Sequence, residues 1–203
     1  VTFLCNPNNP TGLVEPAQNL QALLKIATGI VVVDEAYAEF SDWSAMDLVS
    51  DDLPLAVTRT FSKTLSMAAL RVGYVVAPEW IIQNLEIAVL PYHLDGFKQA
   101  ATIAALSFTD EMENRVAIIK SERSRIQTSL RELKLEVWES GSNFILFRAP
   151  NKPATAIWQS LLDQGVLVRD CSSWPRLAGC LRVTVGTADE NSAFLQAIRA
   201  AVS

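Results

Sequence analysis

Histidine and cysteine are scarce in this chain of 203 residues, and their scarcity excludes several kinds of site. The single histidine, His93, and three scattered cysteines, Cys5, Cys171 and Cys180, do not have the spacing of a zinc ligand set. The chain also has no Cys-x-x-Cys pair and too few cysteines for a disulfide framework. We therefore expect no metal centre, and we expect the three thiols to be reduced.

Long apolar runs and an excess of basic residues are also missing. The longest apolar stretches, such as Gly29–Val33, are strand-sized and far shorter than the roughly 18 residues of a membrane span. A net charge of −5 and an isoelectric point near 4.9 argue against a general nucleic-acid binder. Because half of the residues are apolar, we expect a globular, cytoplasmic protein without membrane or nucleic-acid partners.

Strand and helix patterns alternate over residues 1–108. Continuous apolar runs predict strands at 1–5, 30–34, 55–61 and 72–77, and periodic apolar residues predict helices at 15–27 and 79–90. This alternation is typical of an α/β sheet that is at least partly parallel. The region has a net charge of −6 (5 basic, 11 acidic), against +1 (12 basic, 11 acidic) for 109–203. The shift in charge favours a division of the chain at Phe108.

The rest of the chain predicts a connecting helix over 109–135 and a small α+β domain over 136–203. Its strands and helices are predicted at 143–148, 153–164, 166–170, 181–185 and 188–202. Residues with capping-box spacing predict that the connecting helix begins near Asp110 and that the last helix begins after Thr187.

The first motif is a polar loop, Asn6-Pro7-Asn8-Asn9-Pro10-Thr11-Gly12, directly after the first predicted strand. Two prolines and a glycine restrict the turn that this loop makes. Its asparagines supply amide groups at the carboxyl end of a strand, which is where open α/β sheets bind ligands. An ordinary surface loop has the same composition, so this motif alone leaves both interpretations open.

The second motif, Asp34-Glu35-Ala36-Tyr37, ends the strand predicted at 30–34. An aspartate in this place suits a helix N-cap. It equally suits a carboxylate that is held at a strand end to pair with a cationic ligand atom. We expect Glu35 to be structural.

The third motif places Lys63 after the hydroxyl groups of Thr60 and Ser62 and eight residues before Arg71. The glycine pattern of a phosphate-binding P-loop is missing. A lysine in this setting suits a phosphate contact. It also suits an amine nucleophile whose pKa is lowered by neighbouring cations.

In this order and spacing, the three motifs resemble the fold-type I aminotransferases that use pyridoxal 5′-phosphate. Two later segments, Gly165-Val166-Leu167-Val168-Arg169-Asp170 and Leu181-Arg182-Val183-Thr184-Val185-Gly186, are similar to those of the histidinol-phosphate aminotransferase family. The resemblance covers essentially all of the chain. It implies the C-terminal part of the fold-type I large domain, with a mainly parallel sheet, followed by a small α+β domain.

The resemblance implies a cofactor-binding set made of Asn9, Asp34, Tyr37, Thr60, Ser62, Lys63 and Arg71. Lys63 would be the catalytic residue, since it would form the internal aldimine and then shuttle a proton. Asp34 would pair with the pyridinium nitrogen, and Tyr37 and Asn9 would contact the 3′ oxygen. The other three residues of the set would hold the phosphate.

The resemblance also implies substrates and their contacts. Arg182 would bind the carboxylate of glutamate or 2-oxoglutarate, Arg169 the phosphate of histidinol phosphate, and Asn143 would lie near the substrate. The implied reaction is transamination of L-histidinol phosphate with 2-oxoglutarate, in histidine biosynthesis. A related pyridoxal phosphate enzyme, either an aromatic aminotransferase or a threonine-phosphate decarboxylase, remains an alternative, as does an inactive truncated fragment.

The chain begins with a strand-like run, Val1-Thr2-Phe3-Leu4-Cys5, without an initiating methionine. In the family, a further N-terminal portion precedes the asparagine-rich loop and contributes cofactor contacts. We therefore expect this sequence to lack that portion. The resemblance implies a homodimer for the full-length protein.

Overall fold

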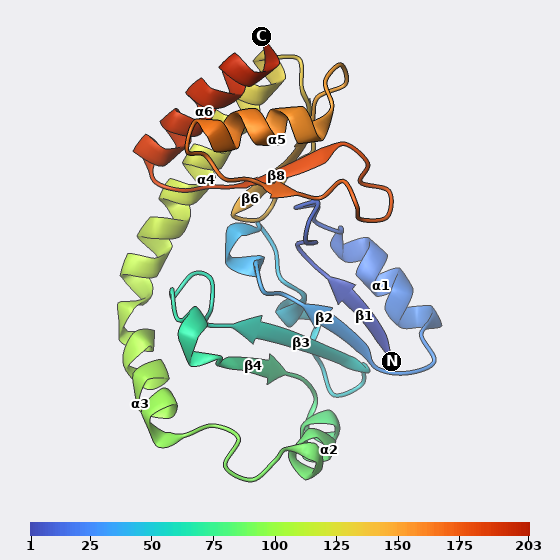
Figure 1. The fold of residues 1–203 in the computed structure, drawn as a ribbon. Helices are drawn as coiled ribbons and strands as arrows, with labels where there is room; N and C mark the ends of the chain where they lie inside the picture. Colours follow the sequence, from blue (N-terminus) through green and yellow to red (C-terminus); the bar gives the residue numbers. More distant parts are fainter. The chain divides into compact units, whose positions relative to one another are not determined.

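The computed structural model describes residues 1–203, which form two compact units (Figure 1). The first unit contains residues 1–7 and 14–116, and the second contains residues 8–13 and 117–203. The sequence-based division at Phe108 assigned the short segment 8–13 to the first region. In the structure this segment belongs with the second unit.

The first unit is built on a four-stranded sheet in the order β1-β2-β3-β4 (Figure 1). Its strands are β1 (Thr2–Cys5), β2 (Val31–Asp34), β3 (Leu55–Thr60) and β4 (Gly73–Val76). The first three strands are parallel, and β4 runs antiparallel to β3. The partly parallel α/β sheet predicted from the alternation of patterns is therefore confirmed.

Helix α1 (Ala17–Ile26) packs its apolar side on this sheet. Leu20 and Leu24 are one turn apart, so they share one face of the helix, and both are buried in a cluster with Val31 and Val33 of β2. The two valines alternate with Val32, as expected for side chains that project from one face of a strand. This packing fixes β2, whose carboxyl end carries the second motif.

Helices α2 (Glu79–Ala88) and α3 (Gly96–Ala105) also belong to the first unit, and α4 (Thr109–Glu132) begins in the first unit and continues in the second. Short 3₁₀ helices are η1 (Ala38–Phe40), η2 (Ala45–Leu48), η3 (Ala68–Leu70) and η4 (Leu106–Phe108). Helix α3 was not predicted, whereas the helix predicted over 109–135 agrees with α4, which begins at Thr109, next to the predicted Asp110. The backbone is already helical at Ala105, Leu106 and Thr109, so α4 follows η4 without a capped start.

The second unit has an antiparallel sheet in the order β5-β6-β8-β7. Its strands are β5 (Glu136–Val137), β6 (Phe144–Arg148), β7 (Arg169–Asp170) and β8 (Cys180–Thr184), and its helices are α5 (Ala154–Asp163) and α6 (Ala188–Val202). Side chains from α4, α5 and α6 pack on one face of the sheet, with Ile145, Phe147 and Leu181 at the centre of this core. The small α+β unit is as predicted.

Strand β7 is shorter than the strand predicted at 166–170. The reason is that its first residues bond elsewhere. The amide of Val166 donates to the carbonyl of Leu161 at the end of α5, and the carbonyl of Val168 accepts from the indole of Trp158.

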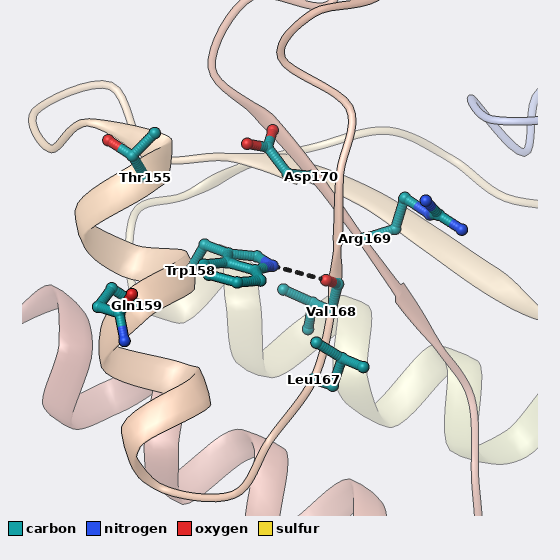
Figure 2. A pocket seen from close by; sticks show the side chains of 7 residues that line it. All are labelled: Thr155, Trp158, Gln159, Leu167, Val168, Arg169 and Asp170. Carbon is teal, nitrogen blue, oxygen red and sulfur yellow. Dashed lines mark hydrogen bonds between the residues drawn. The ribbon is translucent and has the colours of Figure 1, made fainter.

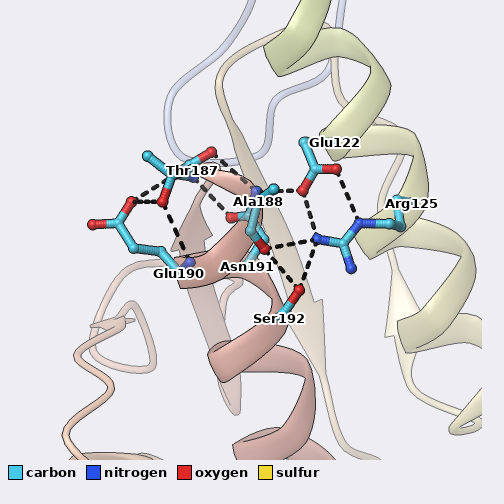
Figure 3. A network of polar contacts seen from close by, with 8 residues as sticks. Glu122, Arg125, Thr187, Ala188, Glu190, Asn191 and Ser192 are labelled. Carbon is cyan, nitrogen blue, oxygen red and sulfur yellow. Dashed lines mark hydrogen bonds and ion pairs between the residues drawn. The ribbon is translucent and has the colours of Figure 1, made fainter.

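The amino end of α6 is tied to α4 by a polar network (Figure 3). The capping box predicted at Thr187 is present, since its hydroxyl accepts from the amide of Glu190 and the Glu190 carboxylate accepts from the amide of Thr187. Asn191, only 2% exposed, donates to Glu122 at 2.8 Å and both donates to and accepts from the backbone of Gly186.

Replacement of Asn191 by alanine is expected to destabilise the second unit by about 2–4 kcal/mol. The change removes the partner of the part-buried backbone N–H and C=O of Gly186, and an unpaired buried group costs about 1–3 kcal/mol. Denaturant unfolding of the variant measures this loss. Replacement of the exposed Gln159 by alanine is the control, and equal stability of the two variants would contradict the assignment.

The stability of the protein is expected to fall in acid partly through Glu122. Hydrogen bonds from Arg125 and then from Asn191 lower the pKa of Glu122 below its ordinary 4.5. A carboxyl group whose pKa is lower in the folded state stabilises the fold at pH values above its unfolded-state pKa. This contribution disappears as the pH falls through the folded-state pKa. We expect the unfolding free energies of the protein and of Glu122→Gln to differ at pH 7 and to converge below about pH 4.5. A constant difference between the two unfolding free energies over this pH range would contradict this role.

Helices long and apolar enough to cross a membrane do not occur in the structure.

Candidate functional site

The carboxyl end of β2 positions Asp34 in the first unit. In the sheet register Asp34 lies between Cys5 of β1 and Thr58 of β3, so the ends of three parallel strands meet at this edge. Its Oδ1 accepts a 3.0 Å hydrogen bond from the amide of Ala36, which holds the carboxylate in an exposed position. A fixed, exposed carboxylate at this edge suits a cationic ligand atom.

Tyr37 and Lys63 lie against each other beside this strand end. The Nζ atom of Lys63 is 5.2 Å from the centre of the Tyr37 ring, within the range of a cation–π contact. Tyr37 is 8% exposed, whereas Lys63 is exposed, so the buried ring forms a platform for a reachable amine. The structure thus brings together two residues of the predicted cofactor set that are 26 positions apart in the sequence.

The loop between β3 and β4 carries Lys63 and is closed by hydrogen bonds. The amide of Phe61 donates to the carbonyl of Val72 at 3.2 Å, and the amide of Met67 donates to the carbonyl of Phe61 at 3.0 Å. The hydroxyl of Thr60 accepts from the amide of Ser62 at 3.1 Å. These bonds place the half-buried Ser62 directly before the lysine and account for the position of Thr60.

Arg71 ends the same loop in a left-handed conformation with φ of 55°, and its side chain is exposed. Its Nη1 donates to the carbonyl of Ala68 at 3.1 Å, which leaves other guanidinium donors for a ligand. Gly73 follows, where an added Cβ would lie 2.6 Å from the carbonyl oxygen of Arg59. Only glycine permits this close approach of β4 to β3.

A buried ion pair supports the strand ends. Glu35, whose side chain is 0% exposed, accepts from Nε of Arg59 at 2.8 Å and from the amide of Ala45. Arg59 also pairs with Glu39 at 2.9 Å. Burial acts to lower the pKa of Arg59, but the two carboxylates outweigh burial and raise it. The expectation that Glu35 is structural agrees with these contacts.

In the second unit, Arg169 of β7 and Arg182 of β8 are paired directly across the sheet. Two like charges at paired positions repel each other, so an anion bound between them would stabilise the pair. Arg169 is exposed, and Figure 2 shows its side chain on the other side of the strand from Trp158. The groove in that figure is lined by Thr155, Trp158, Gln159, Leu167, Val168, Arg169 and Asp170.

Arg182 is held by two neighbours. Its Nη1 donates to the Oδ1 of Asn9, and its Cζ lies 4.7 Å from the centre of the Phe144 ring. Its Nε is buried and has no hydrogen-bond partner. Buried donors without a partner are rare in folded proteins, so this atom of Arg182 stands apart from the satisfied polar atoms around it.

The segment 8–13 places Asn9 in the second unit. The amide of Gly141 donates to the carbonyl of Gly12 at 2.8 Å, and Gly12 has a φ of +76°. A Cβ at Gly12 would lie 2.8 Å from the Cβ of Ser140, so glycine is required here for both its backbone conformation and its size. The turn glycine of the first motif therefore docks the loop that carries Asn9.

Asn143 is half-buried and precedes β6, where its carbonyl accepts from the amide of Val185 at 2.8 Å. The role of its side chain stays a prediction. Sequence reasoning missed Phe144 beside Arg182. This contact depends on the register of β6 and β8, which the sequence alone does not give.

The side chains of the first unit fit pyridoxal phosphate by their chemistry. Lys63 offers an amine for the aldehyde, Asp34 a carboxylate for the ring nitrogen and Tyr37 a phenol for the 3′ oxygen. Ser62 and Arg71 offer a hydroxyl group and guanidinium donors for the phosphate. By contrast, no group of three or more histidine, cysteine, aspartate or glutamate side chains is arranged to hold a metal ion.

Comparison with known proteins gives one consistent family. The family model described as aminotransferase class I and II matches residues 1–198. A histidinol-phosphate aminotransferase of Corynebacterium diphtheriae is 43% identical over 201 residues, which cover 98% of this chain and 54% of that protein. The chain spans about half the length of the curated relatives it matches.

Solved structures show the same fold. The histidinol-phosphate aminotransferase of Sinorhizobium meliloti, in complex with pyridoxal 5′-phosphate, aligns with a TM-score of 0.86 and 27% identity over 98% of this chain and 56% of that one. An L-threonine-O-3-phosphate decarboxylase of Porphyromonas gingivalis aligns with a TM-score of 0.85 and 24% identity over 98% and 63%, which shows likeness of fold alone. The fold-type I assignment from the sequence is confirmed.

Proposed function

Because the chain belongs to the class I and II aminotransferases, we propose that the protein binds pyridoxal 5′-phosphate and transfers an amino group between L-histidinol phosphate and 2-oxoglutarate. The observation that carries this proposal is the exposed amine of Lys63 on the buried ring of Tyr37. Relatives named histidinol-phosphate aminotransferase, up to 44% identical, support this substrate. The proposal places the protein in histidine biosynthesis.

Each residue of the cofactor set has a distinct task in this proposal. Pyridoxal phosphate, when bound, withdraws electrons from the substrate α-carbon. Asp34 would hold a proton on the ring nitrogen by its negative charge, and Tyr37 would donate a hydrogen bond to the 3′ oxygen. Asn9 would supply a second contact to that oxygen. Ser62, Arg71 and Thr60 would hold the phosphate.

Lys63 moves the proton in the proposed reaction. Its amine would take a proton from the substrate α-carbon and carry it during the reaction, while the bound cofactor would supply the electron-withdrawing chemistry. The Tyr37 ring lies 5.2 Å from this nitrogen and borders the space in which the side chain moves.

Arg169 and Arg182 bind the substrate anions. Arg182 receives the carboxylate of glutamate or 2-oxoglutarate, and Arg169 receives the phosphate of histidinol phosphate. Their cross-strand pairing supports the proposal, since it gathers two positive charges at one position of the sheet. Asn143 is proposed as a further substrate contact.

A substrate panel on the full-length protein, and in parallel on the chain of 203 residues, tests the reaction. We expect turnover of histidinol phosphate with 2-oxoglutarate, and we expect weaker turnover of phenylalanine and threonine phosphate. Turnover of phenylalanine alone, or release of carbon dioxide from threonine phosphate, would replace this reaction by that of an aromatic aminotransferase or of a threonine-phosphate decarboxylase. Cofactor binding without turnover of any of them would indicate an inactive fragment.

We further propose that the full-length protein is a cytoplasmic homodimer. Several large apolar side chains of the first unit are exposed, among them Ile87, Leu90, Tyr92, Phe97 and Ile103. A surface of this kind supports contact with a second copy. No disulfide links the three cysteines, which is in keeping with a reducing compartment. Sedimentation at equilibrium should give twice the chain mass, and the mass of one chain at all concentrations would contradict the dimer.

A further inference from the structure

We propose that Phe144 is a positioning residue for Arg182, whose guanidinium group it holds in the orientation that receives the carboxylate of glutamate or 2-oxoglutarate. This inference rests on the proposed function of Arg182. It adds the residue that sets the orientation of the guanidinium before the substrate binds.

The register of the sheet puts the two side chains in reach of each other. Arg182 of β8 is paired with Leu146 of β6, and Phe144 lies two residues before Leu146. Residues two apart in a strand share a face, so Phe144 is a diagonal neighbour of Arg182. The distance of 4.7 Å from Cζ to the ring centre is within the range of a cation–π contact.

The ring is a fixed surface because Phe144 is only 2% exposed. Side chains in a close-packed interior keep one rotamer, so the face of this ring does not move away from the cation. The Oδ1 of Asn9 accepts from Nη1 of Arg182, while Nε has no hydrogen-bond partner. The ring and one amide oxygen are therefore the two contacts that orient this guanidinium.

The ring also counteracts the repulsion between Arg182 and Arg169. Arg169 is paired directly with Arg182, and the repulsion between the two cations favours turning one of them away. The negative face of an aromatic ring attracts the cation and opposes that turn. A leucine would fill much of the same space without this attraction. Replacement of Phe144 by leucine therefore distinguishes the electrostatic effect of the ring from the effect of its volume.

The first test compares three variants of the cofactor-loaded protein. Phe144→Leu should raise the KM and the dissociation constant for 2-oxoglutarate about 3- to 10-fold and leave kcat within about twofold. Phe144→Tyr keeps the ring and should restore both constants. Phe147→Leu is the matched control, because Phe147 is equally buried but lies on the opposite face of β6, in the helical core.

The second test preserves the shape of the ring. Fluorinated phenylalanines introduced at position 144 weaken the negative face step by step without removing the side chain. The dissociation constant for 2-oxoglutarate, measured by calorimetry, should rise with each added fluorine. This series remains informative even where Phe144→Leu does not fold.

The outcomes separate this inference from the function of Arg182. Arg182→Gln should raise the KM for 2-oxoglutarate by more than Phe144→Leu does, and the double variant should show no further rise. No effect of Arg182→Gln would contradict the proposed function. A strong effect of Arg182→Gln, with no effect of Phe144→Leu or of fluorination, would overturn only the role of Phe144. Equal effects of Phe144→Leu and Phe147→Leu would also overturn it.

Discussion

Replacement of Lys63 by alanine is expected to lower kcat by about four orders of magnitude or more. The proposed mechanism assigns both covalent attachment of the cofactor and transfer of the α-proton to this amine, and loss of a general base alone costs about 10²- to 10⁴-fold. Lys63→Arg should be equally inactive, because a guanidinium keeps the charge but does not give up a proton near neutral pH. Rates with histidinol phosphate and 2-oxoglutarate measure both variants.

The matched control for Lys63 is Lys25, an exposed lysine at the end of α1. Lys25→Ala should keep the full rate. Added small amines should restore part of the activity of Lys63→Ala, since they reach the space that the side chain vacates. Retention of more than about a tenth of the rate by Lys63→Ala would show that another group moves the proton.

The second large effect is expected on stability. Replacement of Arg59 by methionine should cost about 3–5 kcal/mol, because it leaves the carboxylate of Glu35 buried without its partner cation. Methionine keeps most of the volume of the arginine side chain, so the loss reports the charge and not a cavity. The free energy of unfolding from denaturant titration measures the change.

An exposed ion pair gives the comparison. The side chains of Arg131 and Glu139 are 45% and 77% exposed, against 12% and 0% for Arg59 and Glu35. Arg131→Met should therefore cost less than about 1 kcal/mol. Adding Glu35→Gln to Arg59→Met should recover part of the stability, since it removes the uncompensated charge. Equal costs for Arg59→Met and Arg131→Met would refute the supporting role of the buried pair.

The sheets of both units could be predicted from the sequence where strands are continuous and β-branched. Residues 30–34 illustrate this, since the observed strand is Val31–Asp34. Periodicity failed where a local contact decides the structure. The run at 166–170 looks like a strand, but Trp158 and the end of α5 take the hydrogen-bonding groups that a strand would use. Helix α3 was missed even though its N-cap, Asp95, which accepts from the amide of Lys98, is a helix-start signal that the sequence contains.

The candidate site could be predicted as a set of residues but not as an arrangement. Motif spacing indicated Lys63 and Tyr37, and only the folded chain shows the amine against the ring. The same holds for Arg182, because its neighbour Phe144 follows from a strand register that spans 38 residues of sequence. Long-range pairing of this kind depends on how strands align, and local propensity carries no information about it.

Reductive trapping tests the central claim most directly. The protein is incubated with pyridoxal 5′-phosphate, treated with borohydride, digested and analysed by mass spectrometry. The proposed function predicts that the added cofactor mass is found on the peptide that contains Lys63 and is absent from that peptide in Lys63→Ala. Labelling that is spread over other lysines, with Lys63 unmodified, would contradict the assignment of this residue and the function built on it.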